Sequence, residues 1–154
     1  DMFVGSPGKI SQSAVCTVFS SKAEIDSAVD VCLKLSRTGD CAEGPHGHIL
    51  EWDVSSVTDM SNMFAGAKNF NADISKWDVS SVTNMEELFR GATSFNQDLS
   101  KWDVSRVTNM QRMFADAHSF LQTLCGAAWV KSNASKIDMF ANSPGFISNT
   151  VSGA

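Results

Sequence analysis

A block with the pattern W-D-V-S-x-V-T-x-M begins at Trp52 and begins again at Trp77 and Trp102. The resulting period of about 25 residues lies within the range of about 20 to 50 residues that is typical of solenoids, in which each unit buries its apolar face only against its neighbours. The period therefore predicts an α/β solenoid, with three full repeats over residues 51–126. No other feature of the sequence constrains the fold as strongly.

The recurring positions of the block are apolar, and the residues between them vary. An inner side chain must contact its equivalent in the next coil, whereas an outer one has only to be soluble. We expect V-T-x-M to form one short strand of a parallel sheet, with strands about 4.8 Å apart. We expect M-F-x-x-A to form a short helix or a turn of 3₁₀ helix behind it. The predicted repeat core consists of Trp52, Trp77, Trp102, Val57, Val82, Val107, Met60, Met85, Met110, Phe64, Phe89 and Phe114.

Two recurring columns are polar: Asp53, Asp78 and Asp103 form one, and Asp59, Asn84 and Asn109 form the other. Aspartates repeated in this way are compatible with calcium binding, because hard cations take carboxylate oxygens. Asp and Asn side chains also accept backbone N–H groups and hold turns. We favour the turn interpretation and predict no metal site and no cofactor.

After the third block the period changes. Trp129 follows Trp102 at a slightly longer spacing than the one between the earlier tryptophans, and the chain then continues to Met139, Phe140 and Phe146. We interpret residues 127–154 as a degenerate fourth coil, because terminal units of repeat proteins are commonly atypical.

A longer repeat overlaps the two ends of the sequence. The chain opens with D-M-F-V-G-S-P-G-K-I-S, and from Asp138 it reads D-M-F-A-N-S-P-G-F-I-S, so that Asp1 aligns with Asp138. We therefore interpret residues 1–16 as the tail of a preceding, similar module, and the end of the chain as the start of the overlap with the next one. The sequence is predicted to be about one period of a tandem array.

Residues 17–50 have a different character. Ser21 and Glu24 have the S-x-x-E spacing of a helix capping box, and apolar residues follow at helical spacing. We predict an amphipathic helix over about residues 21–35 that closes the N-terminal end of the solenoid core. A glycine-rich, irregular segment with two histidines, His46 and His48, comes next. We favour a surface turn for these histidines over a metal site.

Four cysteines allow three pairings if all are oxidised. Cys32 and Cys41 enclose a short loop after the helix and are the preferred disulfide. In an intact array we expect the counterpart of Cys125 to bond the next module's counterpart of Cys16. A zinc site is disfavoured because the spacings contain no C-x-x-C.

Several function classes find no support in the sequence. It contains no G-x-S-x-G, no G-x-x-x-x-G-K and no tyrosine, and its histidines have no linked acid or nucleophile. The net charge of −5 is mild and the basic residues are scattered, which argues against nucleic-acid binding. No apolar run approaches the roughly 20 residues needed to cross a bilayer. We therefore predict that the chain is not an enzyme.

The string W-D-V-S-S-V-T-D-M-S-N-M-F-A-G-A, followed by F-N-A-D-I-S-K-W, resembles the BspA-like surface repeat, also called the mycoplasma-type lipoprotein repeat, a relative of leucine-rich repeats. The resemblance covers residues 50–120 strongly and 121–147 weakly. It implies a leucine-rich-repeat-like stack of coils. It also implies an extracellular or cell-surface location and a non-enzymatic role in adhesion, binding or surface structure.

The leading expectation is an extracellular structural module that assembles end to end into an array or filament with neighbouring modules. Its predicted interface or link consists of Cys16, Cys125, Trp129, Met139, Phe140 and Phe146. The alternative is a recognition or adhesion module that binds a protein or glycan on its strand face. That interpretation uses the varying residues Ser56, Ser61, Ser81, Glu86, Arg106 and Gln111. Asn133 begins a single N-glycosylation sequon, which is compatible with secretion.

Overall fold

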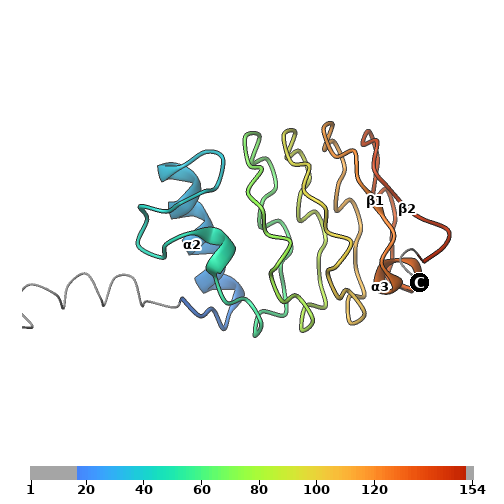
Figure 1. Ribbon diagram of the computed structural model, residues 1–154, viewed down its shortest axis with the longest axis horizontal. Helices are drawn as coiled ribbons and strands as arrows, with labels where there is room; N and C mark the ends of the chain where they lie inside the picture. Colours follow the sequence, from blue (N-terminus) through green and yellow to red (C-terminus); the bar gives the residue numbers. More distant parts are fainter. Residues whose placement is uncertain (1–16, 152–154) are drawn as a thin grey trace, which may run out of the picture.

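The computed structural model describes residues 17–151. Its regular elements are the helix α2 (Lys22–Leu35), the 3₁₀ helix η1 (Ile49–Glu51), the strand β1 (Thr123–Leu124), the helix α3 (Ala127–Val130) and the strand β2 (Phe146–Ile147). α2 lies at one end of the molecule, and α3, β1 and β2 lie at the other (Figure 1). The segments between them are loops and turns.

This content overturns the predicted fold class. The leucine-rich-repeat-like α/β solenoid, with one strand and one helix in every coil, is wrong. The described residues contain two α-helices and one parallel sheet of two strands, and each of those strands has two residues. V-T-x-M forms no strand; the parallel pairing there is limited to isolated bridges that link Asp59 to Asn84, Asn84 to Asn109, and Asn109 to Ser135.

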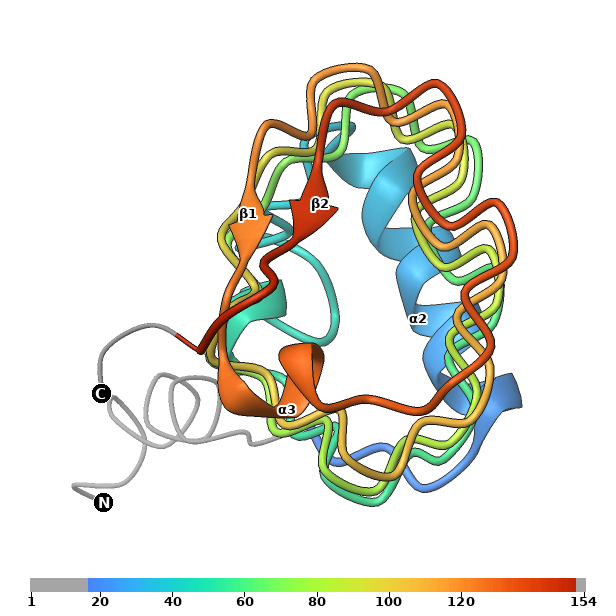
Figure 2. The same ribbon diagram turned by 90° about the vertical axis from the view of Figure 1, so that its right-hand side faces the viewer.

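Residues one sequence repeat apart nevertheless contact each other. We call residues 52–76, 77–101 and 102–126 the repeat loops and residues 127–151 the last loop. They lie side by side in Figure 1, and their outlines nearly overlap in Figure 2, which looks along the row of loops. The N–H groups of Met60, Asn62, Phe64 and Gly66 donate to carbonyl oxygens of the next loop, at 2.7–2.9 Å. The same four donor positions serve the other two interfaces.

The N–H groups between these donors close local turns instead. Met63 donates to Met60, Ala65 to Asn62 and Ala67 to Phe64. The turns cannot merge into a helix because two positions in each repeat loop adopt a left-handed φ. In the first repeat loop these are Asn62 (φ 61°) and Gly66 (φ 74°). The predicted M-F-x-x-A helix is therefore replaced by a series of turns whose alternate N–H groups pair with the next loop.

The predicted repeat core is buried throughout, with at most 5% exposure for any of its members. Two columns of phenylalanine rings run through the core. Phe64, Phe89, Phe114 and Phe140 form the first column, with centroids 5.4–5.7 Å apart. Phe70, Phe95 and Phe120 form the second. A buried aromatic ring contributes both apolar area and specific ring geometry, so these columns fix the register between loops.

The buried tryptophans also connect neighbouring loops. The indole N–H of Trp77 donates to the carbonyl oxygen of Ile49 at 2.9 Å, and that of Trp102 donates to Ile74 at 3.0 Å. Trp129 donates to Leu99 at 2.8 Å despite the changed period. Each buried indole N–H thereby finds an acceptor in the preceding segment, in a carbonyl that also accepts a backbone N–H.

The predicted N-terminal helix is confirmed as α2. Ser21 is its N-cap, and the Ser21 hydroxyl accepts the N–H of Glu24 at 3.2 Å. The Glu24 carboxylate does not complete the capping box at Ser21; it accepts instead from the N–H and hydroxyl of Ser20. The inward face of α2 joins the same hydrophobic cluster as the repeat loops through Ile25, Ala28, Val29 and Cys32.

Candidate functional site

The two ends of the molecule differ in how they are closed. At the N-terminal end, α2 packs over the first repeat loop, and Lys22 Nζ donates to the carbonyl oxygen of Ser61 at 2.5 Å. The predicted disulfide joins Cys32 and Cys41, with Cα atoms 5.3 Å apart. It ties α2 to a segment in which Gly39 lies directly against the Phe70 ring. This end of the core is covered.

At the C-terminal end the backbone pairing stops. The donors of the last loop that correspond to the donors of the repeat loops are the N–H groups of Lys136, Asp138, Phe140 and Asn142. None of these four N–H groups has an acceptor within residues 17–151. An edge of unpaired backbone groups is a template for pairing with another chain. We call this row of four N–H groups the C-terminal edge.

Exposed apolar side chains accompany the C-terminal edge. Ile137 is 60% exposed and Phe146 is 55% exposed, and Phe140, the last ring of its column, is only partly buried. Trp129 and Met139 were predicted to share this interface, but both lie in the core, with exposures of 0% and 2%. They are therefore not part of the exposed end. Ile137 was not predicted to lie at this end, because it occupies a variable position of the repeat.

Lys136 occupies the position that Met60, Met85 and Met110 hold in the repeat loops. Its ammonium group donates to the carbonyl oxygens of Ser132 (2.7 Å) and Ala134 (3.2 Å). Partial burial lowers the pKa of Lys136 below its ordinary value. A charged residue thus ends the methionine column, in the way that natural sheet edges carry lysine against uncontrolled association.

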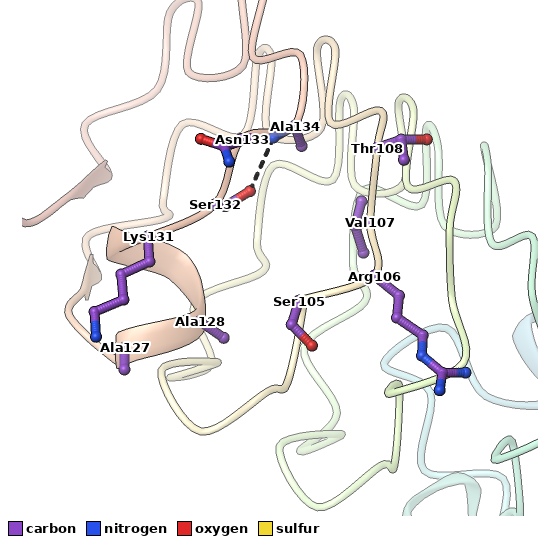
Figure 3. Close-up of a pocket in the computed structure, with 10 residues that line it drawn as sticks. All are labelled: Ser105, Arg106, Val107, Thr108, Ala127, Ala128, Lys131, Ser132, Asn133 and Ala134. Atoms are coloured by element: carbon purple, nitrogen blue, oxygen red, sulfur yellow. Dashed lines mark hydrogen bonds between the residues drawn. The ribbon is translucent and has the colours of Figure 1, made fainter.

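A hollow of about 490 Å³ lies beside the C-terminal edge, between the third repeat loop and the last loop. Val107, Ala127, Ala128 and Ala134 give it an apolar lining, and Ser105, Thr108, Ser132 and Asn133 are polar. Lys131 and Arg106 flank it and point in different directions (Figure 3). The Asn133 of the predicted sequon lies in this lining.

The polar columns hold turns, as predicted. Asp53 and Asp78 accept the N–H of the serine two residues on at 3.0 Å and its hydroxyl at 2.6 Å. These bonds lower the pKa of Asp53 and Asp78, and Ser105 does the same for Asp103. Among residues 17–151 no group of three or more His, Cys, Asp or Glu side chains is arranged to hold a metal ion.

The two histidines of the glycine-rich segment make different contacts. His48 Nδ1 is 2.9 Å from an Asp40 carboxylate oxygen, while the His46 ring packs edge-on against Phe19. Cys16 lies outside the described residues. Cys125 is partly buried, with its Sγ 3.9 Å from the Ser100 hydroxyl. The predicted link between these two cysteines stays a prediction.

Two further observations bear on the alternative interpretations. Ser61 is 8% exposed, so it does not offer a contact surface to a ligand. Arg106, another member of that predicted contact set, is exposed and lies at the hollow. Within the described part of the chain, no helix is both long enough and apolar enough to cross a membrane.

Comparison with known proteins gives one match. A protein-family model described as "Mycoplasma protein of unknown function, DUF285" matches residues 35–152. No curated protein and no solved structure matches the sequence.

Proposed function

Because the chain belongs to the family of Mycoplasma proteins of unknown function DUF285, we propose that it is a non-enzymatic, extracellular module of a tandem-repeat surface protein. Successive modules assemble end to end into an array. The resemblance of W-D-V-S-S-V-T-D-M to BspA-like surface repeats supports the surface location. The Cys32–Cys41 disulfide supports an oxidising compartment.

The observation that carries the proposal is the difference between the two ends. One end is closed by α2 and its disulfide, and the other presents the C-terminal edge with exposed Ile137 and Phe146. Unpaired backbone donors gain hydrogen bonds and apolar side chains lose water when a partner covers them. The partner that we propose is a second copy, because the motif D-M-F-x-x-S-P-G-x-I-S occurs both at Asp1 and at Asp138, as repeated modules of one array would require.

Sedimentation velocity of the full chain over a concentration series tests the proposal. We expect the weight-average mass to rise with concentration above that of the monomer. The double variant Ile137→Glu/Phe146→Glu should remain monomeric, because it places charges in the apolar contact. Leu121→Glu is the matched control, since Leu121 is 67% exposed but lies outside the C-terminal edge.

A monomeric wild type at every concentration would contradict end-to-end assembly. In that case the alternative function, recognition of a protein or glycan through the outward residues of the repeat loops, becomes the better proposal. Electron microscopy of the native protein adds an independent view. End-to-end assembly predicts regular rods, and recognition predicts separate particles.

A further inference from the structure

We propose that the hollow beside α3 is the binding site for residues 17–20 of a second copy, with the Val18 side chain packed against its apolar lining. This inference rests on the proposed function and specifies which segments of two successive modules meet.

The hollow arises from a local change in the sequence pattern. The third repeat loop reads W-D-V-S-R-V-T-N from Trp102, whereas the last loop reads W-V-K-S-N-A-S from Trp129. The last loop is one residue shorter here, and Lys131 and Ala134 stand where the earlier loop has valines. Val57 and Val82 are completely buried, but Val107 is left 5% exposed. A smaller covering segment leaves part of the apolar surface open.

The second copy offers an extended segment of matching character. Val18 forms a parallel bridge with Asp53 of its own first repeat loop; the Phe19 N–H donates to Asp53 and the Asp53 N–H donates to Thr17. Side chains of an extended segment alternate between its two faces. Phe19 is accordingly buried at 3%, while Val18 is 57% exposed on the other face. Val18 is thus an apolar side chain that is left largely exposed to solvent.

The sequence overlap brings this segment to the hollow. In the proposed array, the alignment of Asp1 with Asp138 places the counterpart of Thr17 shortly after Val151 in the sequence. The described chain past β2 ends on the same side of the molecule as α3 (Figure 2). The chain therefore leaves the described residues on the side of the hollow, shortly before the sequence position at which the proposed following module's counterpart of residues 17–20 begins.

Charge complementarity supports the same contact. Arg106 and Lys131 flank the hollow, and neither forms a salt bridge within residues 17–151. In the second copy, the Glu24 carboxylate lies next to the seated segment, where it accepts from Ser20. The contact would bring this carboxylate close to the two cations. The apolar lining of the hollow would thus contact Val18 of the second copy, and the two cations would lie near its Glu24.

Site-specific photo-crosslinking of the full chain tests the contact. Benzoylphenylalanine replaces the exposed Lys131, which flanks the hollow without filling it, and unlabelled and ¹⁵N-labelled copies are mixed so that mass spectrometry separates links within a chain from links between chains. We expect an intermolecular crosslink to the peptide containing residues 17–20. Val18→Lys should weaken self-association by about tenfold or more, because it places an ammonium group against apolar side chains and beside the cations Arg106 and Lys131. Val31→Lys, at a valine 37% exposed on α2, is the control and should change association less.

The outcomes separate the inference from the proposed function. Self-association with crosslinks elsewhere, together with an unchanged Val18→Lys variant, would overturn the hollow as the binding site and leave end-to-end assembly standing. A wild type that stays monomeric up to millimolar concentration would overturn both. Ala128→Arg, which fills the hollow from the opposite side, should weaken association as Val18→Lys does; normal association of this variant would also contradict the proposal.

Discussion

The phenyl ring of Phe89 lies nearly parallel to that of Phe114, with ring centroids 5.4 Å apart and an interplanar angle of 13°. The opposite side of Phe89 faces Phe64 at 5.7 Å. Phe140, at the end of the column, contacts Phe114 but has no following ring among the described residues. The same residue type thus occurs at an interior and a terminal position of one column.

This difference predicts unequal effects of truncation. Phe89→Ala should lower the free energy of unfolding by about 3–5 kcal/mol, because it removes a fully buried ring and leaves a cavity. Phe140→Ala should cost less, since the ring is only partly buried. Urea denaturation followed by tryptophan fluorescence measures both. Equal losses of unfolding free energy for the two variants would contradict the interpretation that an interior ring contributes more to stability than the terminal ring.

The side chain of Asn96 joins the second and third repeat loops through hydrogen bonds. Its side-chain oxygen accepts the N–H of Leu121 at 2.8 Å and the amide of Gln122 at 2.9 Å. Asn96→Ala should lower the free energy of unfolding by about 1–2 kcal/mol, because these donors lose their acceptor. Asn69→Ala is the control, since the Asn69 side chain is exposed and has no hydrogen bond within residues 17–151. Similar stabilities for the two variants would show that the Asn96 bonds are unimportant.

At Gly66 the backbone conformation, and not the space for a side chain, should determine the effect of a substitution. A Cβ there would meet nothing within 4 Å, but φ is +74°. Gly66→Ala should therefore destabilise the protein by about 1 kcal/mol through backbone conformation alone. Gly66→Asn should cost less, because the equivalent positions hold Asp116 and Asn142 at φ values of 59° and 57°. Thermal unfolding distinguishes the cases; an alanine variant as stable as the wild type would contradict this account.

The Asp78–Ser80 pair predicts a pH effect. The Ser80 hydroxyl and N–H lower the pKa of Asp78 in the folded state. A lowered folded pKa adds stability above the unfolded pKa of about 3.9, and that stability is lost as pH falls through the folded pKa. Ser80→Ala should raise the pKa of Asp78 and reduce stability at pH 7, with the difference from wild type shrinking below about pH 4.

NMR titration of the Asp78 carboxyl carbon measures this pKa directly, and urea denaturation at both pH values measures the stability. Ser81→Ala is the matched control, because the Ser81 hydroxyl makes no hydrogen bond within the described residues. A pKa of Asp78 that is the same in Ser80→Ala and in the wild type would contradict the proposed cause.

The contents of the core could be predicted from the sequence better than its backbone could. The Val, Met and Phe columns report which side chains are inside, and S-x-x-E reports where α2 begins, because both signals depend on local spacing. The backbone of the repeat loops depends on left-handed φ values at Asn62, Glu87 and Arg112. Glu and Arg carry no signal for that conformation, so the turns that replace the expected strands and helices could not be read from the sequence.

The candidate site was only partly predictable for a similar reason. The overlap of the two ends predicted that the C-terminal end meets a neighbour, and this contact stays a prediction. Of the residues assigned to that end, Phe140 and Phe146 lie outside the deep core. Trp129 and Met139 lie in the core. The residue type alone does not tell whether an aromatic or sulfur-containing side chain of the last unit is buried or exposed. The hollow depends on one missing residue between Trp129 and Ser135, and its effect is visible only in three dimensions.

The alternation of backbone donors in the repeat loops has an evolutionary consequence. Within residues 60–67, every second N–H group belongs to the next loop and the others belong to local turns, so a single inserted residue there would exchange the two sets and disconnect the neighbour. The last loop shows where length variation is tolerated instead: the extra residues before Trp129 are accommodated around α3, and the donors of Met110, Arg112, Phe114 and Asp116 still meet their acceptors. Insertions and deletions among relatives should therefore accumulate near the α3 position and be rare in the donor segment.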